Sequence, residues 1–173
     1  MDRRKFFKTA AAAGLAAQVP LNSSELLAGE TTTKAGPLAK RPLGKTGEHL
    51  SIIGFGGIVV SGAEQAVADQ AVREAVEAGV NYFDVAPSYG DAELKLGPAL
   101  EPFRKDVFLA CKTGKRKRDE AFAELQTSLR RLRTDHVDLY QLHGLTKPEE
   151  VDTAFGPGGA VEAFIEAKKQ GLT

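Results

Sequence analysis

Cysteine and histidine are scarce in this sequence, which has one cysteine, Cys111, and three histidines among its 173 residues. A single cysteine excludes an internal disulfide, and so few histidines leave little for a structural zinc site. Excess charge of either sign is missing too, because 23 Lys and Arg balance 23 Asp and Glu. No overall field therefore draws the chain toward nucleic acid or an anionic membrane, and a small neutral substrate is the partner that this composition favours.

A long hydrophobic run is also missing. The alanine-rich segment Thr9–Val19 is only roughly a dozen residues, short of the ~20 that an apolar helix needs to cross a bilayer, so we expect no permanent membrane span. Paired arginines and an aromatic pair within Asp2–Lys8 precede it, an order that resembles a twin-arginine export signal. The resemblance implies a signal over residues 1–28 and a periplasmic location in a bacterium. The alternative is an ordinary helix with a basic start, in a cytoplasmic protein.

Strand patterns and helix patterns alternate after a polar linker, rich in Thr, Gly and Lys, over residues 29–40. Apolar runs of strand length predict buried strands over Ile52–Gly57, Val80–Val85, Val107–Cys111 and Val137–Leu142. Apolar residues at helical spacing predict helices over Ala66–Ala78, Asp119–Leu132 and Gly159–Gln170. A further helix is expected over Ala92–Leu100, although Gly97 and Pro98 weaken the pattern. Turn residues between apolar flanks predict a short hairpin or cap over Arg41–Leu50.

This repeated order of strand then helix predicts an α/β fold with parallel strands and right-handed crossovers. Three polar residues, Asp84, Lys112 and His143, recur at strand ends at intervals of about 30 residues, the length of a βαβ unit. Tyr89 lies in the loop after the second strand. The carboxyl ends of the strands form the active-site face of (β/α)₈ barrels, so we expect all four side chains to converge there.

The segments that carry these residues resemble the aldo/keto reductase family. They read Asn-Tyr-Phe-Asp-Val-Ala-Pro-Ser-Tyr-Gly up to Gly90, Cys-Lys-Thr around Lys112, and Asp-Leu-Tyr-Gln-Leu-His up to His143, and the hairpin Leu-Gly-Lys-Thr-Gly is similar too. The resemblance runs from Arg41 to Thr173. It implies a TIM-type barrel that reduces an aldehyde or ketone to an alcohol with a nicotinamide cofactor, NADPH more often than NADH.

The resemblance also implies a role for each of the four residues. Tyr89 would donate a proton to the carbonyl oxygen while the nicotinamide supplies the hydride. A free tyrosine, with a pKa near ~10, is a poor participant at neutral pH unless a cation lies beside it, and Lys112 is suited to supply that charge. Asp84 would hold Lys112 by an ion pair, and His143 would orient the substrate carbonyl.

A glycine pair, Gly56 and Gly57, ends the first predicted strand and would let a cofactor approach the backbone. We expect this pair and Asp84 to contact the cofactor. No third glycine opens the next helix, and this excludes the dinucleotide fingerprint of a Rossmann fold.

Cys111 and the basic run Lys115–Arg118 are expected to have no part in catalysis or nucleic-acid binding. Cys111 precedes Lys112 in its strand, so alternation points it to the opposite face and predicts that it packs against helices. The basic run Lys115–Arg118 has no interleaved aromatic residues, which is typical of a solvated loop rather than a nucleic-acid site.

A closed (β/α)₈ barrel needs ~200 residues or more, and the stretch 41–173 is much shorter. We therefore expect residues 41–173 to form the first four βα units of a barrel, the amino-terminal half, inactive by itself. The alternative is a non-catalytic half-barrel remnant or association module, whose uncovered edge strands would pair with a partner chain.

Overall fold

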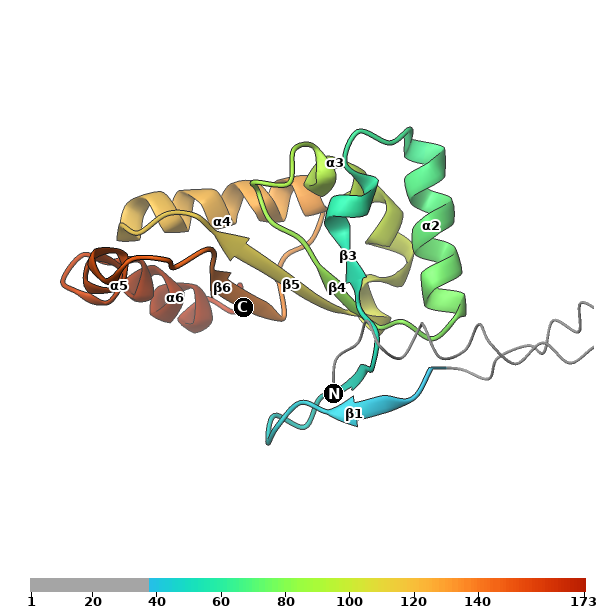
Figure 1. Ribbon diagram of the computed structural model, residues 1–173, viewed down its shortest axis with the longest axis horizontal. Coiled ribbons are helices and arrows are strands. Elements are labelled where there is room, and N and C mark those ends of the chain that lie inside the picture. The colour runs from blue at the N-terminus through green and yellow to red at the C-terminus, as the bar shows by residue number, and fades with distance from the viewer. Residues whose placement is uncertain (1–37) are drawn as a thin grey trace, which may run out of the picture. The chain divides into compact units, whose positions relative to one another are not determined.

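The computed structural model describes residues 38–173 (Figure 1). The export signal expected over residues 1–28 and the linker up to residue 37 lie outside the described residues. Leu38 already packs against the hydrophobic core, and its N–H donates to the carbonyl oxygen of Ala78 at 3.2 Å. None of the helices within residues 38–173 combines the length and the apolar character that crossing a membrane requires.

Most of the elements below are labelled in Figure 1. The strands are β1 (Lys40–Pro42), β2 (His49–Ser51), β3 (Phe55–Gly56), β4 (Tyr82–Asp84), β5 (Phe108–Thr113) and β6 (Leu139–Leu142). The α-helices are α2 (Gln65–Glu77), α3 (Ala92–Leu100), α4 (Arg118–Leu132), α5 (Pro148–Phe155) and α6 (Ala160–Lys169). Two 3₁₀ helices are η1 (Gly57–Val60) and η2 (Glu101–Asp106).

The central sheet is parallel and has the strand order β3-β4-β5-β6. Neighbouring strands in the sheet are thus consecutive along the chain, and a helix lies in each connection. This is the connectivity of a TIM-type barrel. In register, Asp84 lies beside Gly56 on one side and Ala110 on the other, and Lys112 lies beside Gln141. Within the described chain, β3 and β6 are the two outer edges of this sheet.

The main hydrophobic core lies between the sheet and the helices. Figure 1 shows α3 and α4 on the same side of the sheet, and α3 packs against both α2 and α4. Phe83, Leu109 and Cys111 point into this core and are fully buried. Side chains alternate along a strand, so Asp84 and Lys112 lie on the opposite face. The polar residues are therefore separated from the core by the sheet itself.

The predicted helices agree closely with the observed ones. Helix α3 has the predicted bounds, α4 differs from prediction by one residue at its start, and α2 and α6 differ by one residue at each end. Gly97 lies inside α3 because a Cβ there would stand 2.3 Å from the carbonyl oxygen of Arg131 in α4, so only glycine permits this close helix crossing. The predicted hairpin is confirmed: β1 and β2 pair antiparallel, and Gly44 and Gly47 in its turn have positive φ.

The first strand of the parallel sheet was predicted too long. Only Phe55–Gly56 pairs with β4, and Ile52 and Ile53, expected to be buried, are 53% and 57% exposed. The reason lies in the preceding residue, since the N–H of Ser51 donates to Oδ1 of Asn81 at 2.7 Å and its hydroxyl donates to the carbonyl oxygen of Ile53 at 2.7 Å. These bonds hold the chain in a bend after β2, where a straight strand was expected.

Helix α5 (Pro148–Phe155) has no counterpart among the predicted helices. Pro148 stands in its first turn, together with Glu149 and Glu150. Both features are ordinary signals of a helix start, so the helix was recognisable from the sequence.

Candidate active site

The carboxyl edge of the parallel sheet gathers the four predicted residues. Asp84 is the last residue of β4, Lys112 is the last but one of β5, and His143 follows β6 directly. Tyr89 lies in the turn between β4 and α3, where its N–H donates to the carbonyl oxygen of Ala86 at 3.0 Å. The structure therefore brings together side chains from three successive strand ends.

Lys112 is anchored on this edge by two acceptors. Its ammonium forms an ion pair with Oδ1 of Asp84 and donates to the carbonyl oxygen of Val85 at 3.2 Å. The side chains of Lys112 and Asp84 are 13% and 25% exposed. A pair this far from solvent is screened less than a surface pair, so it keeps the ammonium in place and keeps its charge effective nearby.

The other oxygen of Asp84 accepts a hydrogen bond from the hydroxyl of Tyr82, at 3.4 Å. Burial, and then the charge of Asp84, raise the pKa of the Tyr82 hydroxyl. Tyr82 therefore stays protonated at neutral pH and serves as a donor to Asp84. It is suited to hold the carboxylate and is a poor acid for a substrate.

The Tyr89 ring contacts both remaining members of the group. The ammonium of Lys112 lies 5.2 Å from the centre of the ring, within the range of a cation–π contact. The imidazole of His143 meets the same ring edge to face, with centroids 5.7 Å apart and planes at 87°. The Ser88 hydroxyl and Nδ1 of His143 are 3.2 Å apart, so a hydrogen bond on that nitrogen orients the imidazole.

The glycine pair borders this group at β3. Gly56 is exposed and lies beside Asp84 in register, and a Cβ there would have no atom within 4 Å. Gly57 is buried, and a Cβ there would meet the carbonyl oxygen of Asp84 at 3.0 Å and the Val85 side chain at 3.1 Å. Packing against β4 thus explains Gly57, whereas Gly56 leaves room for a ligand to approach the backbone beside Asp84.

Three residues of this edge were not singled out from the sequence: Tyr82, Ser88 and Gln141. Tyr82 and Gln141 each stand two residues before a predicted site residue, so strand alternation alone places them on the same face. Gln141 is the neighbour of Lys112 in the sheet, and its buried Oε1 has no hydrogen-bond partner among the described residues. No pattern marks Ser88, whose contact with His143 joins two loops 55 positions apart along the chain.

Cys111 takes no part in this edge. Its side chain is fully buried on the helix side, with Sγ 3.7 Å from Oε1 of Glu93, so the prediction that it packs in the core is confirmed. Burial, followed by the charge of Glu93, raises the pKa of the thiol to about 12. In the part of the chain that the structure describes, no three His, Cys, Asp or Glu side chains are grouped to hold a metal ion.

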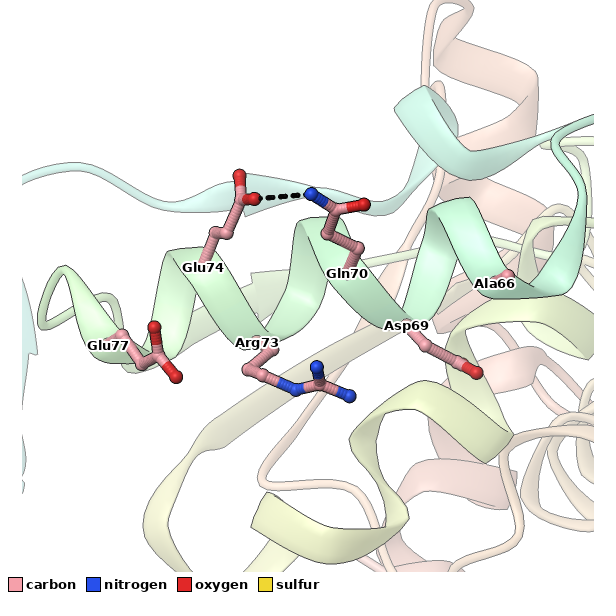
Figure 2. Close-up of a pocket in the computed structure, with 6 residues that line it drawn as sticks. All are labelled: Ala66, Asp69, Gln70, Arg73, Glu74 and Glu77. Carbon is pink, nitrogen blue, oxygen red and sulfur yellow. Dashed lines mark hydrogen bonds between the residues drawn. The ribbon is translucent and has the colours of Figure 1, made fainter.

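A hollow on the outer face of α2 shares no lining residue with this group. Figure 2 shows the side chains that line it, all from this one helix: Ala66, Asp69, Gln70, Arg73, Glu74 and Glu77. The amide of Gln70 donates to Oε1 of Glu74 at 2.8 Å, an ordinary pair one helical turn apart. We regard this hollow as a solvated helix face.

A parallel βα sheet with reactive side chains along its carboxyl edge places the chain in the class of TIM-type barrel folds, of which the described residues contain four strands. Comparison with known proteins agrees. The pattern of the aldo/keto reductase family matches residues 52–173. The chain belongs to the aldo/keto reductase family, and it is therefore related to oxidoreductases.

Individual relatives give the same result. The chain is 36% identical over 149 residues to the uncharacterized oxidoreductase YqkF of Bacillus subtilis, covering 78% of this chain and 46% of that protein. It is 34% identical over 120 residues to L-galactose dehydrogenase of Arabidopsis thaliana, covering 61% and 38%. The holo form of aldo-keto reductase AKR11C1 from Bacillus halodurans superimposes with a TM-score of 0.68 at 35% identity, covering 78% and 48%. The chain thus spans about half the length of these relatives, or less.

Proposed function

We propose that the protein reduces an aldehyde or ketone to an alcohol with NADPH, and that Tyr89 is the proton donor. The observation that carries this proposal is the ammonium of Lys112, held by Asp84 and 5.2 Å from the centre of the Tyr89 ring. Membership in the aldo/keto reductase family supports it. NADH is the alternative cofactor, and the substrate class is a small neutral carbonyl compound.

Each residue has a distinct part in this proposal. The hydroxyl of Tyr89 gives its proton to the carbonyl oxygen, and the negative charge left on the phenol oxygen is stabilised by the adjacent ammonium of Lys112. Asp84 holds the ammonium by an ion pair, and its negative charge offsets part of the positive charge of Lys112. His143 lies against Tyr89 and donates a hydrogen bond to the same carbonyl oxygen, which fixes the direction from which the substrate approaches.

The cofactor would be held in part by the backbone at Gly56 and Gly57 and by Asp84. The open space at Gly56, beside the Asp84 carboxylate, fits a ligand that approaches the backbone closely. When bound, the nicotinamide supplies the hydride. The remaining contacts would come from elsewhere in a complete barrel, so we propose that the 173-residue polypeptide assayed alone does not turn over.

Substitution of Tyr89 tests the assignment in the full-length protein, by which we mean a polypeptide that carries residues 1–173 together with the rest of the barrel. Tyr89→Phe removes only the hydroxyl, and we expect turnover with small aldehydes and ketones to fall by about 10²–10⁴, the usual contribution of a general acid. NADPH affinity, measured by fluorescence titration, should stay within about twofold, because the lost interaction acts in the transition state.

Tyr82→Phe is the matched control, since it removes a hydroxyl that bonds Asp84 and not the substrate. It should lower turnover by much less than Tyr89→Phe. Retained turnover in Tyr89→Phe, or equal losses in the two variants, would contradict the role of Tyr89 as proton donor.

We further propose that the protein is exported to the periplasm by a twin-arginine route. The support is the arginine pair and aromatic pair within Asp2–Lys8, followed by an apolar segment of signal length.

A further inference from the structure

One residue of the basic run Lys115–Arg118 is not solvated as the sequence predicted. The side chain of Arg116 is only 15% exposed. Its Nη2 donates to the carbonyl oxygens of His143, at 2.7 Å, and Gly144, at 3.2 Å. Its Nη1 donates to the carbonyl oxygen of Gly114 at 3.0 Å. The guanidinium thus joins the loop after β5 to the segment that follows β6.

The backbone around Arg116 is fixed as well. The carbonyl oxygen of Arg116 accepts from the N–H of Ala160, and the carbonyl oxygen of Gly158 accepts from the N–H of Arg118, both at 2.9 Å. These two bonds tie the basic loop to the start of α6. The guanidinium is therefore presented from a backbone with little freedom, so few conformations are lost when it binds the His143 segment.

Both main-chain polar groups of His143, its N–H and its carbonyl oxygen, have hydrogen-bond partners. Its N–H donates to the carbonyl oxygen of Thr113 at 2.9 Å, continuing the ladder between β5 and β6. Its carbonyl oxygen has no partner in the ladder because β6 has ended, and it accepts a hydrogen bond from Nη2 of Arg116. The next residue, Gly144, has a φ of 62°, so the chain turns sharply at once. The direction of the imidazole then depends on this anchored peptide.

A second charge supports the same arrangement. Oε1 of Glu150 lies 3.8 Å from Nη2 of Arg116, and Oε2 of Glu150 accepts from the N–H of Thr146 at 3.0 Å. The bond from Thr146, and to a smaller degree the Arg116 charge, lower the pKa of the Glu150 carboxyl. The segment from His143 to Glu150 is thereby bound to the guanidinium at its beginning and at its end.

We infer that Arg116 is a positioning residue that holds the imidazole of His143 against the ring of Tyr89. This role rests on the proposed function in so far as His143 orients the carbonyl. Arginine is required because its fork reaches carbonyl oxygens of both loops at once, whereas a lysine ammonium is a single point with a flexible stem. The edge-to-face contact of the two rings is the feature that Arg116 maintains.

The test measures that contact directly by NMR, as the nuclear Overhauser effect between ring protons of Tyr89 and His143. Arg116→Gln removes the charge, and Arg116→Lys keeps it but loses the fork. We expect the effect to fall at least about twofold in both variants, and kcat of the full-length protein to fall about tenfold, as for a misplaced active-site group. Arg118→Gln and Arg118→Lys are matched controls, because this neighbouring side chain is exposed at the start of α4.

The readouts separate this role from a general structural one and from the proposed function. NADPH affinity should stay within about twofold of wild type, with the loss in kcat rather than in cofactor binding. A ring contact of unchanged strength in the Arg116 variants overturns the inference, whatever their activity. If wild-type protein reduces no carbonyl compound but the ring contact still depends on Arg116, the proposed function fails and the positioning role stands.

Discussion

Removing the ammonium of Lys112 is the sharpest perturbation of the proposed chemistry. Lys112→Met keeps the length and apolar stem of the side chain but deletes its charge, which lies 5.2 Å from the centre of the Tyr89 ring. At that separation, with an effective dielectric constant of about 20, a full negative charge on the tyrosine and the ammonium attract by ~3 kcal/mol. The neighbouring carboxylate of Asp84 offsets part of this attraction, so about half, ~1.5 kcal/mol, is a reasonable net value.

Each ~1.4 kcal/mol of lost transition-state stabilisation lowers the rate about tenfold. We therefore expect kcat of Lys112→Met to fall by about 10- to 100-fold in the full-length protein, measured as NADPH consumption at saturating carbonyl compound. The lower limit applies if Asp84 offsets half of the charge, and the upper limit if its effect is small. Single-turnover rates with bound NADPH should fall equally, since the affected step is chemical.

Two variants bracket this result. Lys115→Met deletes a similar charge from an exposed residue only three positions along and should leave kcat unchanged. Asp84→Asn keeps the ammonium but loosens it, and should cost less than Lys112→Met if the charge is what matters. A kcat for Lys112→Met within about twofold of wild type would refute the electrostatic reasoning, because even the discounted attraction predicts a larger loss.

The remaining predictions concern stability and export. Gly97→Ala should destabilise the fold by about 1–3 kcal/mol in urea titrations, because its Cβ would stand 2.3 Å from a carbonyl oxygen of α4; Gly114→Ala, with no atom within 4 Å, should not, and equal effects would contradict the packing argument. Asp138→Ala should lower the free energy of unfolding by about 1–3 kcal/mol, since its carboxylate accepts from a main-chain N–H of β5 at 2.8 Å and from an arginine at 2.9 Å. Asp135→Ala is the control, because Asp135 is 93% exposed. An unchanged urea midpoint for Asp138→Ala would count against this role. Replacing the arginine pair of residues 3–4 by lysine should keep the precursor in the cytoplasm, as shown by fractionation, and unchanged export would exclude a twin-arginine route.

Local patterns were sufficient for most of the elements. Helical spacing predicted α4 to within one residue, because a helix is specified by contacts three and four residues apart, all of them visible in a short window. The same reasoning failed at Ile52 and Ile53. They have the apolar character of a buried strand, but a serine beside them bonds an asparagine 30 positions later, and a strand pattern of a few residues does not contain that contact.

The sequence by itself determined which strand ends carry polar residues along the candidate site, and in what order. Asp84, Lys112 and His143 recur at the period of a βαβ unit, and parallel strands deliver that period to one edge of the sheet. Only the tertiary structure decided how the edge is supported. The contact of Arg116 with the carbonyl oxygen of His143 joins residues 27 positions apart, and it depends on the paths of two loops. The register of the strands is set by a repeating pattern that the sequence shows. The path of a loop is set by single contacts between distant residues, and no repeat in the sequence predicts those contacts.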